Sequence, residues 1–417
     1  MDDPRELLAA GERILAGALG GGVRLGAPER LGGTRRRSGV WRVPLAGGPS
    51  GAPESVVLKR ATGDDGPAFD SDGGDEPESP VSRFFAEWAG YLFLGTVAGG
   101  AMAPRLYGVD RALGVLALED LGEGECLADR LTGADPHAAE RALLAYAAAL
   151  GRLHAATAGR RAELDTVRER IGARGETDAE RETRPGVWRR ECVAPFLAAC
   201  ESLGVGAAPG VEREADAVAA MVERPGALEA FTPGDTCPDN HRLEGGGVRF
   251  FDFEFCGFRH ALLDAAYFRS PFPSCWCVHR LPEGVPARME AAYRAELAPA
   301  RPEVADDAAF RAAMARASAY WLLWTLGLAP DHGLDLAGAL AQDRPWGPAS
   351  VRQRHLLRLE TFAAHADARG TLPALAETAA ALAGRLRALW PDASMPLYPP
   401  FRAAAEAADA RAPVRCA

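Results

Sequence analysis

Lysine and asparagine are almost absent from this chain. It has one lysine, Lys59, against 46 arginines (47 basic residues less one), and one asparagine, Asn240. Such a bias is typical of a GC-rich coding sequence, which avoids the codons of both residues. Arginine is no substitute where a compact ammonium is needed, because its planar guanidinium is larger and fixed in geometry. We therefore expect Lys59 and Asn240 to occupy positions where a substitute, such as arginine for lysine, would not serve the same role.

The chain also lacks the features of secreted, membrane and nucleic-acid-binding proteins. Its eight cysteines form no paired C-x-x-C framework, which predicts reduced thiols in a cytoplasmic protein. The first residues show neither the basic nor the apolar region of a signal peptide. The longest uncharged run, 88–104, is interrupted by glycines and short for a membrane span. A formal net charge of −10 argues against a nucleic-acid partner and is compatible with a cationic substrate.

The most specific pattern lies between residues 231 and 268. Asp235 and Asn240 are five residues apart, and Asp252 follows twelve residues later. The intervening residues predict a β-hairpin that turns at three glycines and returns Asp252 to the side of Asn240. Phosphoryl transfer from ATP needs such a set. An aspartate accepts the proton of the attacking hydroxyl, while an amide oxygen and a carboxylate hold Mg²⁺ on the phosphates.

These motifs, G-D-x-x-P-x-N followed by D-F-E-F-x-G and D-x-A, resemble those of the aminoglycoside phosphotransferase and choline kinase-like group. The resemblance implies a protein-kinase-like α+β fold that is bilobal, with a small β-rich N-lobe and a large helical C-lobe. A length of 417 residues also predicts two lobes. The resemblance further implies ATP and Mg²⁺ as cofactors, Asp235 as the catalytic residue, and Asn240 and Asp252 as metal ligands. Pro233 and Cys237 stand where the group usually carries histidine.

Four residues in the first part of the chain are candidates for binding the nucleotide phosphates. Lys59 ends the apolar run S-V-V-L-K, the strand position from which a kinase lysine reaches the phosphates. Glu87 lies on the next expected helix and would hold that lysine in an ion pair. Gly33 and Thr34 belong to a glycine-rich segment between two candidate strands, which would cover the phosphates.

The lobes are expected to meet near Gly122, with residues 1–121 in the N-lobe and 122–417 in the C-lobe. The run L-A-L-E-D-L-G resembles the connector between the lobes of the group. The resemblance implies that backbone groups of Glu119 and Leu121 bind the adenine there.

An acidic segment, about 62–80, interrupts the N-lobe. It is rich in glycine, serine and proline, which predicts a disordered insertion. Phe69 is the only sizeable apolar residue between positions 65 and 78. We therefore expect the segment to contribute little to stability.

Several other polar residues have both an ordinary and a functional interpretation. Cys275, Cys277 and His279 are three potential zinc ligands within five residues, but a structural zinc site needs a fourth, so buried side chains are the favoured interpretation. His154 is interpreted as a core histidine bonded to backbone, and Asp264 as a helix cap that supports the active-site loops.

Beyond residue 285 the chain is expected to be helical, at 287–298, 308–328, 351–368, 375–390 and 401–410. In the resemblance such helices form the walls of the acceptor pocket.

Two alternatives to a small-molecule kinase remain. A nucleotide-binding pseudokinase with a regulatory role is one, because Pro233 replaces the usual histidine, although the retained Lys59, Asp235 and Asn240 favour an enzyme. A protein kinase is disfavoured, since no H-R-D, D-F-G or A-P-E segment is present. Glu254 could contact Mg²⁺ or substrate, or face solvent. The expected activity is transfer of the γ-phosphoryl group of ATP to a hydroxyl of a small molecule. Neither the acceptor nor the oligomeric state follows from the sequence.

Overall fold

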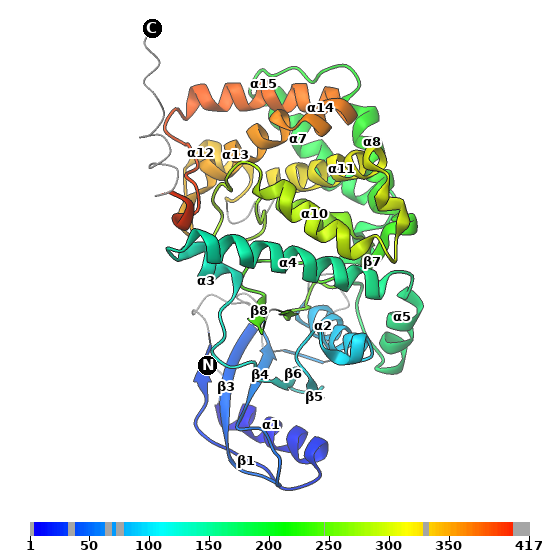
Figure 1. The fold of residues 1–417 in the computed structure, drawn as a ribbon, viewed down its shortest axis with the longest axis vertical. Helices are drawn as coiled ribbons and strands as arrows, with labels where there is room; N and C mark the ends of the chain where they lie inside the picture. The colour runs from blue at the N-terminus through cyan, green and yellow to red at the C-terminus, as the bar shows by residue number, and fades with distance from the viewer. Residues whose placement is uncertain are drawn as a thin grey trace.

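The described part of the chain forms two lobes stacked along the long axis of the molecule (Figure 1). The computed structural model describes residues 4–31, 38–62, 69–71, 79–245, 247–327 and 333–402. The smaller lobe contains an antiparallel sheet with one helix on its outer side, and the larger lobe is mostly helical. The predicted α+β bilobal fold is confirmed.

The smaller lobe is built on a six-stranded sheet in the order β1-β3-β4-β6-β5, with β2 paired to β3. A small core between the sheet and α1 includes Leu7, Val43 and Leu58. The elements of this lobe, in chain order, are α1 (Pro4–Leu19), β1 (Arg24–Leu25), β2 (Glu29–Arg30), β3 (Ser38–Gly47), β4 (Ser55–Ala61), α2 (Pro80–Gly95), η1 (Ala98–Gly100), β5 (Leu106–Asp110) and β6 (Val115–Glu119).

Strand β4 carries the single lysine, and its alternating pattern decides where that lysine faces. Val56 and Leu58 are fully buried against α1 in the small core. Because side chains of a strand alternate between the two faces of the sheet, Lys59 lies on the face away from α1. It is nevertheless 6% exposed, so the single lysine is directed into the interior between the lobes.

Helix α2 fills that interior. Ser79 caps its first turn by accepting a hydrogen bond from the backbone N–H of Ser82, and Pro80 occupies the first helical position. Apolar residues surround the helix, and Phe85, Phe93 and Leu94 are fully buried. A helix that is buried on most of its sides lies in a core, and α2 thus packs the smaller lobe against the larger one.

The larger lobe contains most of the helices. The central one, α4, is capped by Asp135, whose carboxylate accepts hydrogen bonds from the backbone N–H groups of His137 and Ala138. It crosses the molecule beside α10 (Figure 1). The elements of this lobe up to β10 are α3 (Leu127–Thr132), α4 (Pro136–Thr157), α5 (Arg161–Arg170), α6 (Asp178–Glu182), the π-helical turn η2 (Arg189–Val193), α7 (Ala194–Ser202), α8 (Val211–Glu223), η3 (Gly226–Leu228), β7 (Glu229–Thr232), β8 (His241–Glu244), β9 (Gly247–Phe250) and β10 (Gly257–His260).

The remaining elements follow the expected helical pattern with one break. The predicted helix at 351–368 divides at His365, whose backbone is extended and whose ring accepts a hydrogen bond from the N–H of Asp367. The predicted helix at 401–410 lies almost wholly outside the described residues. The elements are α9 (Leu262–Ala265), η4 (Ala266–Phe268), α10 (Val285–Leu297), η5 (Pro302–Ala305), α11 (Asp307–Leu326), α12 (Leu336–Ala341), β11 (Pro345–Trp346), β12 (Ala349–Ser350), α13 (Val351–Ala364), α14 (Ala366–Thr371) and α15 (Pro373–Leu389).

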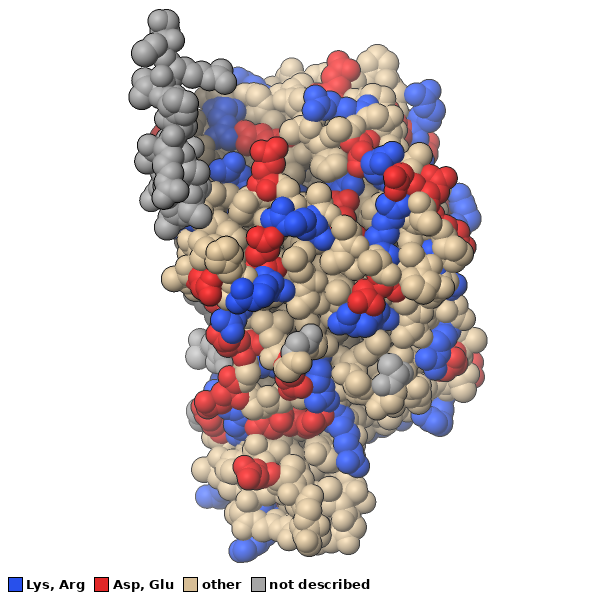
Figure 2. Space-filling view, in the orientation of Figure 1, with Lys and Arg blue, Asp and Glu red and all other residues tan. Residues whose placement is uncertain are grey.

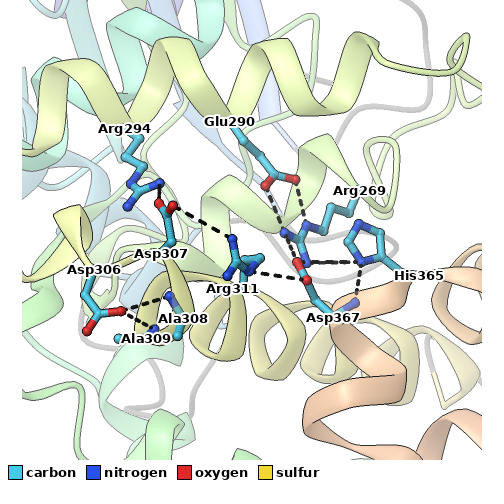
Figure 3. Close-up of polar contacts among 10 residues, drawn as sticks. All are labelled: Arg269, Glu290, Arg294, Asp306, Asp307, Ala308, Ala309, Arg311, His365 and Asp367. Carbon is cyan, nitrogen blue, oxygen red and sulfur yellow. Dashed lines mark hydrogen bonds and ion pairs between the residues drawn. The ribbon is translucent and has the colours of Figure 1, made fainter.

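A buried arginine links three of these helical segments. The guanidinium of Arg269 donates two hydrogen bonds to Glu290 of α10, at 2.6 and 2.9 Å, and one to Asp367 of α14 at 2.9 Å (Figure 3). Arg311 of α11 lies 3.8 Å from the same aspartate. Because Arg269 is 6% exposed, its charge needs these carboxylates.

The surface charges are mixed. On the face shown in Figure 2, acidic and basic side chains alternate over the larger lobe. No helix among the described residues has both the length and the apolar character that crossing a bilayer requires.

The acidic segment of the smaller lobe is described only in part, at 62, 69–71 and 79–80. Phe69 packs edge-on against Phe84 of α2, with 5.3 Å between ring centroids, and also contacts Gly114. One residue of the expected insertion is therefore attached to the smaller lobe.

Candidate active site

The predicted hairpin brings Asn240 and Asp252 together between the lobes. Strands β8 and β9 pair antiparallel, with His241 opposite Phe250, as the glycine turn predicted. The backbone N–H of Phe251 donates to the carbonyl oxygen of Asn240 at 3.1 Å. Asp252 is the next residue, so the two predicted metal ligands flank one end of the hairpin.

Pro233 stands where a histidine was expected, and other residues hold the loop that carries Asp235. The hydroxyl of Tyr146 on α4 donates to the carbonyl of Thr236 at 3.0 Å, and the N–H of Ala128 donates to the carbonyl of Pro238 at 3.1 Å. The side-chain amide of Asn240 donates to the backbone carbonyl of Asp235 at 3.0 Å. This last bond uses the amide nitrogen, so the amide oxygen of Asn240 is the atom that could bind a cation.

Gly234 is required at its position in the same loop. Its φ is +85°, in the left-handed region, and a Cβ atom there would lie 2.1 Å from the carbonyl oxygen of Phe255. Strand β7, which ends two residues before Gly234, pairs with β10, with Thr232 opposite Gly257. The sequence did not predict these two short strands. The loop therefore leaves a fixed strand through a turn that only glycine can make.

The carboxylate of Asp235 is bound by a serine from a distant segment. The hydroxyl of Ser274 donates to Oδ1 of Asp235 at 2.8 Å, and the Ser274 oxygen itself lies 2.7 Å from the hydroxyl of Tyr267. Burial raises the pKa of Asp235 to about 6, although hydrogen bonds from Cys237 and Ser274 oppose the shift. Asp235 is thus ionised at neutral pH but more basic than an exposed aspartate.

Lys59 contacts two carboxylates from different parts of the chain. Its ammonium lies 2.7 Å from Oε2 of Glu87 and also binds Oδ1 of Asp252. Burial alone would lower the pKa of Lys59, but the charges of Asp252 and Glu87 outweigh it and hold the pKa well above its ordinary value. Burial raises the pKa of Glu87 to about 7 against the effect of Lys59. The predicted lysine–glutamate pair is therefore present in the structure, with Asp252 as a third member.

This arrangement has properties that fit a divalent cation. Two carboxylates share one ammonium, so the ionised cluster carries a negative charge that a cation can offset. Asp252 has a φ of +68°, an unfavourable value for a residue with a side chain, which is a feature of functional sites. Its side chain is 28% exposed, unlike the buried Glu87. Carboxylate and amide oxygens are ligands suited to Mg²⁺, so Asp252 and Asn240 could hold it.

The segment between the lobes is fixed by Asp120, which the sequence analysis did not select. Its carboxylate accepts hydrogen bonds from the guanidinium of Arg42 at 2.7 Å and from the hydroxyl of Ser55 at 2.6 Å. The backbone N–H of Glu119 donates to the carbonyl of Arg105, so only the carbonyl of Glu119 could be offered to a nucleotide. Leu121 follows Asp120, two residues after β6 ends at Glu119 and the chain leaves the sheet.

Two of the predicted phosphate-binding residues cannot be placed. Gly33 and Thr34 belong to 32–37, outside the described residues, and their role stays a prediction.

Two supporting residues have other partners than expected. His154 is fully buried, but its ring contacts the hydroxyl of Tyr293 at 2.8 Å and the carboxylate of Asp264 at 3.3 Å, not the backbone. Asp264 lies within α9, which Ala261 precedes, so its predicted role as a helix cap is wrong. Glu254 is partly exposed and, after Asp252 and Glu87, contributes to the raised pKa of Lys59.

Comparison with known proteins gives structural similarity without sequence similarity. No protein-family model and no curated protein matches the chain. Among solved structures, a protein from Ralstonia eutropha JMP134, provisionally described as an aminoglycoside phosphotransferase, has a TM-score of 0.48 and 15% identity over 91% of this chain and 98% of its own. A choline/ethanolamine kinase family protein from Mesorhizobium loti has a TM-score of 0.42 and 17% identity, covering 84% of this chain and 93% of its own. A macrolide 2'-phosphotransferase from Brachybacterium faecium has a TM-score of 0.40 and 17% identity, covering 79% and 97%.

These descriptions name the group that the sequence motifs resemble. At such identities and TM-scores they carry no conclusion about activity, which depends on the side chains of the site.

Proposed function

We propose that this protein is an ATP-dependent phosphotransferase that moves the γ-phosphoryl group to a hydroxyl of a small molecule. The observation that carries the proposal is the contact of Lys59 with both Glu87 and Asp252. It places a cation suited to phosphates next to a carboxylate suited to a metal ion, from segments 193 residues apart. Phosphoryl transfer depends mainly on such positioning of charge.

In this proposal, residues of the smaller lobe bind the nucleotide. The ammonium of Lys59 contacts the α- and β-phosphates, and Glu87 fixes its direction. Backbone groups of Glu119 and Leu121 bind the adenine, and Gly33 and Thr34 cover the phosphates.

Asp235 acts on the acceptor. With its pKa raised to about 6 by burial, its carboxylate is ionised at neutral pH and can accept a proton from a hydroxyl. The bond from Ser274 shows that a hydroxyl can reach this carboxylate at 2.8 Å. An acceptor hydroxyl that took the same place would be oriented by Asp235 and would transfer its proton there.

Asn240 and Asp252 would hold Mg²⁺, because their oxygens flank one end of the hairpin and the carboxylate cluster retains negative charge. When bound, the ion would neutralise charge on the phosphate oxygens. The residues themselves contribute a preformed position, since Asn240 is fixed by Asp235 and Asp252 by Lys59.

A pseudokinase of the same fold is the competing function, and Pro233 is its support. Tyr146, Ala128 and Asn240 hold the loop after Pro233, which favours an enzyme. The experiment that separates the two is a measurement of ADP formation from Mg·ATP over a panel of hydroxyl acceptors, including amino alcohols, sugars and aminoglycosides. An enzyme forms ADP faster with at least one acceptor, and that acceptor gains the mass of one phosphoryl group. Tight ATP binding with no acceptor effect would establish the pseudokinase instead.

A further inference from the structure

Three cysteines converge next to the loop that carries Asp235. Cys275 and Cys277 come from one segment, and Cys237 comes from the loop itself. The sequence suggested His279 as their partner, but its ring nitrogen lies 3.3 Å from the carbonyl of Cys277 and its ring packs on Tyr398. In its place the fold brings Cys237 to the pair, together with the carboxylate of Asp239.

The distances among these side chains suit one metal ion. The sulfur atoms of Cys237 and Cys275 and a carboxylate oxygen of Asp239 all lie within 4.8 Å of one another. The Cys277 sulfur lies 3.3 Å from that of Cys275. Thiolates bind zinc at about 2.3 Å, which separates neighbouring sulfurs of a tetrahedral site by roughly 3.8 Å. Small side-chain rotations would therefore bring the group to zinc geometry.

The surroundings favour a cation together with its anionic ligands. The three cysteines are at most 5% exposed, while Asp239 is half-buried and opens the cluster to the surface. Arg354 is fully buried and donates to the carbonyls of Cys275 at 2.7 Å and Trp276 at 2.6 Å. It forms no ion pair with any of the described residues, and its Nε has no hydrogen-bond partner. Three thiolates and one carboxylate around Zn²⁺ would carry a net charge of −2, of which this guanidinium offsets one unit.

Ordinary packing of buried thiols is the competing explanation. Cys256 is an example of such packing. Its Sγ donates to the carbonyl of Ala86, and it belongs to no cluster of potential metal ligands among the described residues. The cluster differs because side chains from two segments, 237–239 and 275–277, meet with a carboxylate among them. Thiolates and carboxylates are both ligands of zinc, a borderline-soft ion, so this mixed set suits it.

We propose that Cys237, Cys275 and Asp239 form a zinc-binding site, with Cys277 as the fourth ligand after rotation of its side chain. The site would join the loop of Asp235 to the segment of Ser274, whose hydroxyl lies 3.4 Å from the Cys237 sulfur. Zinc would thereby control the position of Asp235. The binding itself does not depend on the proposed kinase activity.

The test uses the reduced, metal-free full chain. Titration with Cd²⁺ should produce a thiolate-to-metal charge-transfer band in the near ultraviolet that saturates at one equivalent, and Zn²⁺ should remove it. Cys275→Ser should abolish the band. Cys126→Ser should keep it, because Cys126 lies at the N-cap of α3, where serine is favoured.

Asp239→Asn provides a second variant at the edge of the cluster, in case Cys275→Ser fails to fold by circular dichroism. It should retain the band but weaken Zn²⁺ affinity at least about tenfold. The proposal is overturned if the wild-type chain shows no saturable band, if the band persists in folded Cys275→Ser, or if Asp239→Asn binds Zn²⁺ like the wild type.

Discussion

The ammonium of Lys59 on β4 contacts the carboxylate of Asp252, which follows it by 193 residues. The same ammonium contacts Glu87 at 2.7 Å, so one cation joins the sheet, helix α2 and the hairpin that ends at Asp252. These three segments lie apart from one another along the chain. Their meeting at the single lysine of the chain is the basis for assigning a phosphate site to this position.

Replacement of Lys59 by arginine should leave the fold intact and remove most activity. The larger planar guanidinium cannot occupy the position of an ammonium between Glu87 and Asp252. ADP formation and circular dichroism of Lys59→Arg would test this, with Arg60→Lys on the same strand as the control. Near-normal activity in Lys59→Arg would contradict the role of the lysine.

Asp252→Asn should abolish Mg²⁺-dependent turnover without loss of secondary structure. A neutral amide cannot offset the cost of dehydrating the ion as a carboxylate does. The measurement is the rate against Mg²⁺ concentration for the variant and the wild type. An unchanged Mg²⁺ dependence would place the metal elsewhere, with Glu254 as the candidate that the sequence offers.

Activity should fall as the pH drops through about 6, because burial raises the pKa of Asp235 to about 6 and only its ionised form can accept a proton. The bond from Ser274 stabilises the ionised form, so Ser274→Ala should move this acidic limb upward by about one pH unit. Ser202→Ala on α7 should leave the profile unchanged. The assignment fails if the limb lies near the ordinary aspartate value of about 4, or if Ser274→Ala shifts it downward.

Phe69→Ala should lower the free energy of unfolding by about 2 kcal/mol, the loss of one half-buried aromatic contact with Phe84. Denaturant unfolding would measure the change, and Phe69→Leu should retain most of the stability. An unchanged free energy in Phe69→Ala would support the expectation from the sequence that the acidic segment contributes little to stability.

The sequence predicted those parts of the site that depend on spacing along the chain. Twelve residues with a glycine turn define a hairpin, and that hairpin places Asp252 beside Asn240. An apolar alternating run predicts the strand of Lys59, and the next helix offers Glu87 as its one acidic residue. Each inference needed only local periodicity and the rarity of lysine and asparagine.

The contacts that depend on the packing of distant helices could not be predicted. Ser274 reaches Asp235 because α13 holds its segment, with Arg354 bound to the carbonyl of Cys275 and Arg358 to that of Pro273. Nothing in the sequence distinguishes these two arginines from the other 44. The meeting of Cys237 with Cys275 has the same origin. The sequence named only Cys275, Cys277 and His279 as potential ligands and favoured buried side chains, because Cys237 is distant along the chain.

The central claim is that Asp235 orients and deprotonates an acceptor hydroxyl. Its most direct test is the acceptor-dependent rate of ADP formation in Asp235→Asn, measured beside ATP affinity, with the exposed Asp216→Asn of α8 as control. The account predicts a loss of about 10²-fold or more in turnover, with ATP affinity within a few-fold of the wild type and the control unaffected. Tight ATP binding by a chain in which Asp235→Asn changes no rate, with any acceptor of a broad panel, would contradict it.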